Sequence, residues 1–213
     1  MIRAVLFDMD GLLLNTEEIY MQTNFEVCAQ LGYSMTKATY YQMMGVVKQI
    51  AEQIYVQSIP GFDSITFHRL FDQNFQEKLN NGDVRLKKGA HELLEYLEQN
   101  KVLKAIATSS SSSWTHQLLE RMNVKEYFNK IITGEMVENS KPHPDIYLYA
   151  AECLGVQPSQ CLVLEDSENG IRAGKAANMR VCMIPDLISY NPSYAEFCDH
   201  VCNDLIQVLN LFK

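Results

Sequence analysis

Short, largely apolar runs recur along most of the chain. They lie at residues 4–7, 103–107, 130–133, 161–164 and 180–184, and turn-forming or charged residues follow them. A strand that is buried on both faces of a parallel sheet has this pattern, because the side chains on both of its faces are covered. The pattern therefore predicts five buried parallel strands.

The segments between these runs have the spacing of helices. Their apolar residues recur three and four positions apart, which is typical of a helix with one buried face. The stripes consist of Ala90, Leu93, Leu94 and Leu97, of Trp114, Leu118, Leu119 and Met122, and of Ile146, Tyr149, Ala150 and Leu154. Strands and helices that alternate over residues 84–213 predict an α/β fold with a doubly wound, Rossmann-like parallel sheet.

Residues 15–82 interrupt this alternation. They contain helical stripes, such as Met21, Phe25, Cys28 and Leu31, and the turn-forming sequence Asn80-Asn81-Gly82-Asp83 leads back to the sheet. We therefore expect an α-helical cap domain at 15–82, inserted into an α/β core domain formed by residues 1–14 and 83–213. The length of 213 residues fits one domain with an insertion, since domains average roughly 150 residues.

Composition and charge narrow the class of protein. The chain is 47% hydrophobic and 21% charged, as in folded globular proteins, and its formal net charge is −8. A negative chain is a poor partner for nucleic acid or an anionic membrane surface. We expect neither as a partner, so an anionic substrate must be held locally, by a metal ion or a well-placed lysine.

Features of the sequence also predict a cellular location. The apolar run at residues 4–7 ends at Asp8, which is too short for a signal segment, and no apolar run is long enough to span a membrane. The six cysteines form no C-x-x-C pair, which favours free thiols in a reducing compartment. We expect a cytoplasmic protein, and a monomer, because no heptad run requires a dimer.

The polar residues that follow the strand-like runs should meet at one edge of the sheet, where parallel α/β sheets bind ligands. They are Asp8, Asp10, Thr108, Ser109, Lys141, Glu165 and Asp166. Clustered carboxylates raise one another's pKa unless a cation lies among them. Hard oxygen ligands on short loops suit Mg²⁺, which also binds phosphate oxygens. Together with a lysine, this set predicts a clamp for a phosphate group.

Each of these motifs alone has an ordinary structural explanation. Asp8 and Asp10 suit a polar turn at the end of a strand, Thr108 and Ser109 suit a helix N-cap, and Glu165 and Asp166 suit a cap before the next helix. Their order along the chain, each at the end of a strand-like run, favours a shared site. A dinucleotide-binding domain would need G-x-G-x-x-G after the first run, where Gly11 stands alone.

The sequence resembles the haloacid dehalogenase superfamily. Four motifs carry the resemblance: Phe7-Asp8-Met9-Asp10-Gly11 with Thr16, Ala107-Thr108-Ser109-Ser110, Ser140-Lys141-Pro142-His143-Pro144-Asp145, and Leu164-Glu165-Asp166-Ser167 with Asn169-Gly170. The helical insertion is similar to the first type of cap in this superfamily, which occurs in its β-phosphoglucomutase-like and sugar-phosphate phosphatase branch. Together the motifs organise nearly the whole chain.

The resemblance implies phosphoryl transfer with two distinct aspartates. Asp8 would be the nucleophile that forms an aspartyl phosphate, and Asp10 would act first as general acid and then as general base. Mg²⁺ would be held by the Asp8 carboxylate, the Asp10 backbone carbonyl and Asp166, with Glu165 as a ligand directly or through water. Thr108, Ser109 and Lys141 would bind the phosphoryl oxygens.

The same resemblance bears on the substrate. Thr16, Gly45 and Lys48 match positions near the substrate, the last two in a loop that carries Gly-Val-Ser-Arg in the mutases. Here Val47 replaces the serine, and Lys48 lacks the bidentate fork of arginine. Tyr20 also stands where the mutases have histidine. We therefore favour a phosphatase of small metabolites, such as hexose or nucleoside phosphates, with a phosphohexomutase as the alternative and a non-catalytic binding protein as a third candidate.

Overall fold

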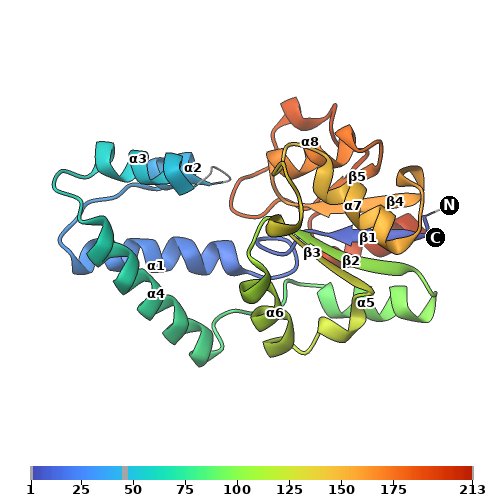
Figure 1. Cartoon of the computed structure of the whole chain (residues 1–213), viewed down its shortest axis with the longest axis horizontal. Coiled ribbons are helices and arrows are strands. Elements are labelled where there is room, and N and C mark those ends of the chain that lie inside the picture. The colour runs from blue at the N-terminus through green and yellow to red at the C-terminus, as the bar shows by residue number, and fades with distance from the viewer. Residues whose placement is uncertain (1, 45–47, 213) are drawn as a thin grey trace. The chain divides into compact units, whose positions relative to one another are not determined.

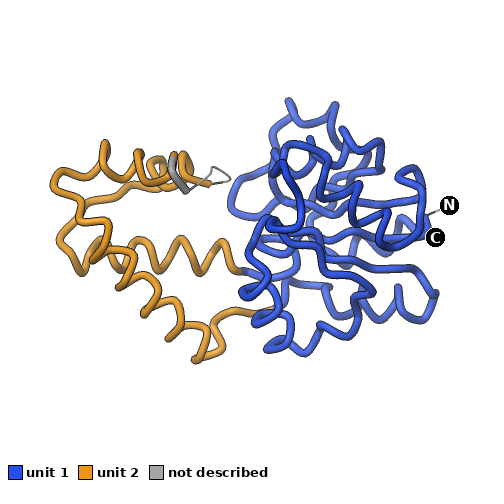
Figure 2. The backbone as a smooth tube through the Cα atoms, in the orientation of Figure 1, with its two compact units in different colours: residues 1–15, 86–213 blue, residues 16–85 orange. Residues whose placement is uncertain are grey.

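A computed structural model describes residues 2–44 and 48–212 of the chain; the side chains of residues 48 and 49 are not described. The chain forms two compact units, residues 1–15 with 86–213 and residues 16–85 (Figure 2). The sequence placed the helical insertion at 15–82, so the two divisions differ by one residue at the first boundary and by three at the second.

The larger unit contains a parallel sheet in the order β3-β2-β1-β4-β5-β6 (Figure 1). Its strands are β1 (Ala4–Phe7), β2 (Leu103–Thr108), β3 (Lys130–Thr133), β4 (Cys161–Glu165), β5 (Arg180–Met183) and β6 (His200–Val201). The central strand β1 is fully buried and pairs with β2 and β4. The five predicted strands and the doubly wound Rossmann-like fold are confirmed.

Helices cover both faces of this sheet. They are α5 (Ala90–Gln99), α6 (Ser112–Arg121), α7 (Asp145–Leu154), α8 (Glu168–Ala176) and the short α9 (Leu205–Val208). Helices α7 and α8 pack side by side on the face that carries Ala4 and Leu6, and Figure 1 shows α5 and α6 on the other side. Short 3-10 turns complete the unit at Lys125–Tyr127, Gly134–Met136, Pro158–Gln160, Pro192–Tyr194 and Leu209–Phe212.

Two details differ from the sequence-based expectation. The stripe predicted for α7 included Tyr149, but Tyr149 is 39% exposed while Tyr147 is fully buried. The face that meets the sheet contains Tyr147, Ala150 and Ala151, which have helical spacing as well. Strand β6 was not predicted because its two residues, His200 and Val201, are both exposed and form no apolar run.

Among its described residues, the smaller unit contains helices joined by loops and no strand. It consists of α1 (Thr16–Gln30), α2 (Lys37–Met43), α3 (Lys48–Ser58) and α4 (Ser64–Asn81). Aromatic rings fill much of its interior; Tyr20 stacks on Phe75 with ring centroids 4.5 Å apart. Helix α1 also buries Thr23 and Asn24, two polar residues that the apolar stripe did not predict. Polar groups inside a helical unit need partners or a ligand.

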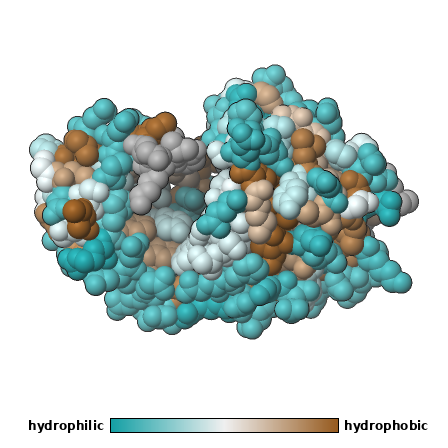
Figure 3. Space-filling model, in the orientation of Figure 1, coloured by the Kyte–Doolittle hydropathy of each residue, from teal (hydrophilic) through white to brown (hydrophobic). Residues whose placement is uncertain are grey.

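The surface differs in composition from these interiors. In the space-filling view the visible surface of each unit is mostly hydrophilic, with smaller apolar patches (Figure 3). Among the described residues, no helix has both the length and the apolar character needed to cross a bilayer.

Candidate active site

The register of the sheet brings three functional loops to one edge. Phe7 pairs with Ile106 on β2 and with Leu164 on β4, so the residues that follow these strands emerge side by side. The backbone N–H of Asp8 donates to the Leu164 carbonyl at 3.0 Å, which extends the pairing by one residue. Asp8 and Glu165 therefore lie at neighbouring strand ends, as the sequence predicted.

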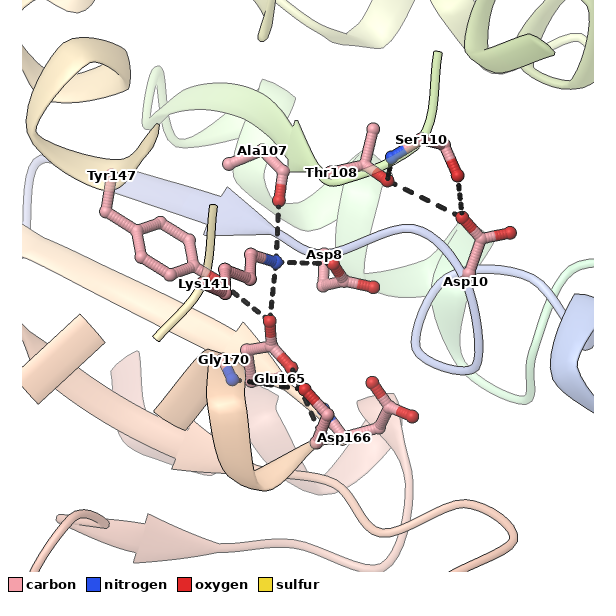
Figure 4. Close-up of polar contacts among 11 residues, drawn as sticks. Asp8, Asp10, Ala107, Thr108, Ser110, Lys141, Tyr147, Glu165, Asp166 and Gly170 are labelled. Atoms are coloured by element: carbon pink, nitrogen blue, oxygen red, sulfur yellow. Dashed lines mark hydrogen bonds and ion pairs between the residues drawn. The ribbon is translucent and has the colours of Figure 1, made fainter. Parts of the chain in front are cut away.

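Lys141 connects these strand ends (Figure 4). Its Nζ lies 2.6 Å from Oδ1 of Asp8, 2.6 Å from Oε1 of Glu165 and 3.0 Å from the Ala107 carbonyl oxygen. The side chain of Lys141 is only 6% exposed. One buried ammonium thus holds two carboxylates and the end of β2 together.

The charges of this cluster depend on burial and on one another. Burial raises the pKa of Asp8 to about 7. The positive charge of Lys141 lowers this pKa, but the negative charges of Glu165 and Asp10 raise it and partly cancel that effect. Burial alone would lower the pKa of Lys141, but Asp8 and Glu165 outweigh it and hold that pKa well above its usual value. Burial would raise the pKa of Glu165, yet the ammonium keeps it below its ordinary value. Lys141 and Glu165 are therefore charged at neutral pH.

Hydrogen-bond donors surround the Glu165 carboxylate. Oε1 accepts from Lys141 and from the Tyr147 hydroxyl at 2.8 Å. Oε2 accepts from the backbone N–H groups of Asp166 and Ser167 and from the Ser167 hydroxyl. A carboxylate has about four acceptor positions, and five donors contact this one. The structure thus places Glu165 against Lys141 and its own loop, as an anchor for the ammonium.

Gly170 leaves room for this carboxylate. A Cβ atom at Gly170 would lie 1.8 Å from the Cδ and Oε1 atoms of Glu165, far inside any allowed contact. The Gly170 N–H also donates to the hydroxyl of Ser167, which caps α8. Glycine in the fourth motif is therefore a steric requirement of the buried glutamate.

The second aspartate lies against the loop that follows β2. Oδ2 of Asp10 accepts from the Ser110 hydroxyl at 2.7 Å, and the Thr108 hydroxyl lies 3.5 Å from the same oxygen (Figure 4). Thr108 is buried, whereas Asp10 and Ser110 are partly exposed. The Asp10 carboxylate is therefore accessible to a bound molecule or to water.

The oxygen atoms near Asp8 suit a hard cation. Asp166 directly follows β4, and in Figure 4 its carboxylate points to the side of the site where Asp8 and Asp10 lie. Within residues 2–44 and 48–212, no three acidic, histidine or cysteine side chains form a ready-made metal cluster. Two carboxylates and a backbone carbonyl are nevertheless a donor set that Mg²⁺ accepts when water and phosphate complete its shell. A nearby cation would also relieve the cost of ionising the buried Asp8.

The remaining predicted site residues are more scattered. Ser109 follows Thr108 and is exposed. Thr16 begins α1 in the smaller unit and is fully buried. Lys48 begins α3, but its side chain is not described, and Gly45 lies outside the described residues. The structure thus gathers Asp8, Asp10, Thr108, Lys141, Glu165 and Asp166 and leaves the substrate residues of the helical unit as predictions.

The helical unit contains a cavity of its own. It has a volume of about 280 Å³, and aromatic residues, Glu17 and Asn24 are part of its lining. The Asn24 Nδ2 atom donates to the Tyr55 hydroxyl at 2.6 Å, and its buried Oδ1 has no partner among the described residues. A buried amide oxygen without a partner is suited to accept a hydrogen bond from a ligand.

Sequence reasoning missed two contributors to the larger unit's site. Tyr147 donates to Glu165, and its ring lies 5.0 Å from Nζ of Lys141. Its signal was present in the spacing of Tyr147, Ala150 and Ala151. Ser110 contacts Asp10; it stands in the second motif and in the serine run, but neither feature indicated this contact.

Comparison with known proteins identifies the family. The family profile described as haloacid dehalogenase-like hydrolase matches residues 5–184. The chain belongs to this family. It is 31% identical over 183 residues to the phosphorylated carbohydrates phosphatase of Thermotoga maritima, with 83% of this chain and 82% of that protein covered.

Two further relatives of this hydrolase are informative. A Drosophila melanogaster protein named "Probable pseudouridine-5′-phosphatase" is 34% identical over 189 residues, which cover 85% of this chain and 80% of that protein. A Thermotoga maritima crystal structure provisionally assigned as a β-phosphoglucomutase has a TM-score of 0.83 and 27% identity, over 99% and 98% of the two chains. This chain is accordingly a phosphoric monoester hydrolase of the β-phosphoglucomutase-like branch.

Proposed function

We propose that this phosphatase hydrolyses a small phosphomonoester in an Mg²⁺-dependent reaction that passes through a phosphorylated Asp8. The observation that carries the proposal is the shared ion pair of Lys141 with Asp8 and Glu165, at the strand edge where Asp10 and Asp166 also lie. A cation next to a buried carboxylate suits a nucleophile that must meet a negatively charged phosphoryl group.

In the first half of the reaction, a carboxylate oxygen of Asp8 attacks phosphorus. The bond from phosphorus to the leaving-group oxygen breaks, and protonated Asp10 transfers its proton to that oxygen. The products are an aspartyl phosphate at Asp8, a free alcohol and an ionised Asp10. Two aspartates two positions apart thus divide attack and proton transfer between them.

In the second half, water replaces the alcohol. Ionised Asp10 takes a proton from the water as its oxygen attacks phosphorus, and the bond between phosphorus and the Asp8 oxygen breaks. Inorganic phosphate leaves, Asp8 is an ionised carboxylate again and Asp10 is protonated again. Lys141 and Thr108, with the backbone and hydroxyl of Ser109, bind the equatorial phosphoryl oxygens during both halves.

Mg²⁺ would be held by Asp8, the Asp10 carbonyl and Asp166. It would neutralise negative charge where the phosphoryl group meets the carboxylates. Haloacid dehalogenase phosphatases are generally metal-dependent, which supports this assignment. Glu165 already accepts hydrogen bonds from several donors. These bonds favour a role in which Glu165 holds Lys141 in place over one in which it contacts the ion directly.

The substrate we propose has a neutral, hydroxyl- or N–H-bearing leaving group of the hexose or nucleoside type. The cavity in the helical unit supports this choice, because its described lining offers acceptors at Glu17 and Asn24 and contains no basic residue. The names of the relatives, which refer to a carbohydrate phosphate and a nucleoside phosphate, support it as well. The cytoplasmic location and monomeric state remain predictions.

A substrate panel tests this function. Phosphate release should be measured for hexose, hexitol and nucleoside monophosphates with Mg²⁺ and again after EDTA treatment. The proposal predicts turnover that EDTA abolishes and added Mg²⁺ restores; full activity in metal-free buffer would contradict it. The mutase alternative is tested in the same panel, because conversion of β-glucose 1-phosphate in the presence of its bisphosphate activator, without phosphate release, would favour it.

A further inference from the structure

One hydroxyl of the serine run at residues 109–113 contacts the acid–base residue. The Ser110 hydroxyl donates to Oδ2 of Asp10 at 2.7 Å, a distance typical of a well-formed O–H···O bond (Figure 4). The Thr108 hydroxyl reaches the same oxygen only at 3.5 Å. Of these two hydroxyls, Ser110 therefore makes the stronger contact with Asp10.

The backbone of Ser110 is itself fixed on both sides. Its N–H donates to the Thr108 hydroxyl at 3.1 Å, and its carbonyl accepts from the Gly134 N–H at 3.3 Å. Gly134 approaches so closely that a Cβ there would lie 2.6 Å from the Ser109 carbonyl oxygen. The direction of the Ser110 hydroxyl is thus set by a loop that is held to the ends of both β2 and β3.

Other serines of the run make different contacts. The Ser111 hydroxyl caps α6, and the Ser112 N–H donates to the Glu135 carboxylate at 3.1 Å. Ser113 is exposed, and its hydroxyl lies 3.4 Å from that of Ser111. These serines organise the start of the helix, so Ser113 offers a matched control for Ser110.

We propose that Ser110 is a positioning residue that holds the Asp10 carboxyl in the orientation needed to protonate the leaving group. The proposal rests on the proposed function, in which Asp10 is the general acid. A general acid must hold its proton within about 2.6–3.2 Å of the receiving oxygen. The 2.7 Å contact with Ser110 restricts the orientations of the partly exposed Asp10 carboxyl to those that meet this requirement.

The hydrogen bond from Ser110 also favours the transfer itself. As the phosphorus–oxygen bond breaks, the proton moves from Asp10 to the leaving oxygen and Asp10 becomes a carboxylate. Ser110 keeps its own proton throughout and donates to that carboxylate. Hydrogen bonds to ionised acceptors are roughly twice as strong as neutral ones, so this contact strengthens as charge develops.

Dependence on the leaving group separates positioning from a merely structural role. Ser110→Ala should lower kcat/KM by about 10- to 100-fold for an alkyl phosphate such as a hexose phosphate, whose alcohol leaves poorly without a proton. It should lower kcat/KM for p-nitrophenyl phosphate by only about threefold or less, because p-nitrophenolate needs little help from an acid. The ratio kcat/KM is the right quantity, since it includes only the steps up to departure of the leaving group.

Three parallel variants make the result decisive. Ser110→Thr keeps the hydroxyl and should restore most of the lost kcat/KM, and Ser113→Ala should behave as wild type on both substrates. Equal losses on both substrates with Ser110→Ala, or a loss confined to KM, would overturn the positioning role. Asp10→Asn tests the underlying function separately: a uniform loss there would overturn Asp10 as general acid, whereas a selective loss with a uniform Ser110→Ala effect would overturn only the role of Ser110.

Discussion

The ammonium nitrogen of Lys141 lies 2.6 Å from the Oδ1 atom of Asp8, although 133 positions separate the two residues in the chain. The same nitrogen lies 2.6 Å from Glu165, so two buried carboxylates share one positive charge. Such a group depends on its cation, because without the ammonium two carboxyl groups would be left unpaired in a low-dielectric interior. The site and the stability of the core unit are therefore linked.

Replacing Lys141 should lower both the activity of the site and the stability of the core unit. Lys141→Ala leaves Asp8 and Glu165 without their cation, and breaking a buried pair in this way costs about 3–5 kcal/mol of unfolding free energy. Urea denaturation measures that loss, and phosphate release measures the accompanying loss of activity. Lys88→Ala is the matched control, since Lys88 pairs with Asp204 but its side chain is 74% exposed. If both variants were equally stable, Lys141 would not hold the site together.

Stability of the metal-free protein should depend on pH through Asp8. Its pKa is about 7 in the folded protein and near 3.8 in the unfolded chain, so the folded state binds more protons between these values. The contribution of the Asp8 carboxyl to the free energy of unfolding is therefore fully present below about pH 4 and is lost as the pH rises to about 7. Asp8→Asn removes the buried acid, so its Tm should exceed that of wild type increasingly from pH 4 to pH 7.

Thermal melts in EDTA at several pH values test this expectation. Addition of Mg²⁺ at pH 8 should raise the Tm of wild type more than that of Asp8→Asn, because the ion would compensate the ionised carboxylate. A Tm difference that stays constant from pH 4 to pH 8 would contradict a raised pKa at Asp8.

Much of the core site could be predicted from the sequence because strand ends are visible there. An apolar run that stops at Asp8 or Glu165 marks the edge of a parallel sheet, and the sheet itself then brings those residues together. The prediction needed only the order of the motifs and the rule that ligands bind at the carboxyl ends. It did not need the side-chain geometry.

The sequence could not predict which of two neighbouring polar side chains is buried and which faces the site. Glu165 and Asp166 are adjacent carboxylates, yet Glu165 is fully buried among donors while Asp166 is partly exposed. Which of the two turns inward depends on space at Gly170 and on the Tyr147 hydroxyl, both of which belong to tertiary packing. The short strand β6 was missed for a related reason, since an exposed two-residue strand has no apolar pattern.

Gly170→Ala tests the packing around Glu165. The new Cβ would meet the carboxylate at 1.8 Å, so Glu165 must turn away and lose several of its donors. We expect a loss of stability of roughly 1–3 kcal/mol or more, as for other overpacked interiors, together with a large fall in kcat. Glu168→Ala, in the first turn of the same helix, is the control. Wild-type activity in Gly170→Ala would show that the anchored position of Glu165 is not required.

Variants of the helical unit should change which alcohol is accepted. Lys48→Ala, and separately Asn24→Leu, should alter the ranking of natural substrates, because the sequence predicts Lys48 near the substrate and Asn24 lines the cavity of the helical unit. Hydrolysis of p-nitrophenyl phosphate should change much less, since the core carries the chemistry. The measurement is kcat/KM across the substrate panel for each variant. An equal loss on every substrate would mean that these residues serve the fold or the chemistry, and selection by the cap would be wrong.

The most direct test of the account is to trap the phosphorylated enzyme. Enzyme mixed with a labelled substrate and Mg²⁺ is quenched in acid, treated with hydroxylamine in one half of the sample, and mapped by mass spectrometry. We predict an acid-stable, hydroxylamine-labile phosphate on Asp8 that disappears in Asp8→Asn. A hydroxylamine-labile phosphoprotein that persists in Asp8→Asn would contradict the assignment of Asp8 as the nucleophile.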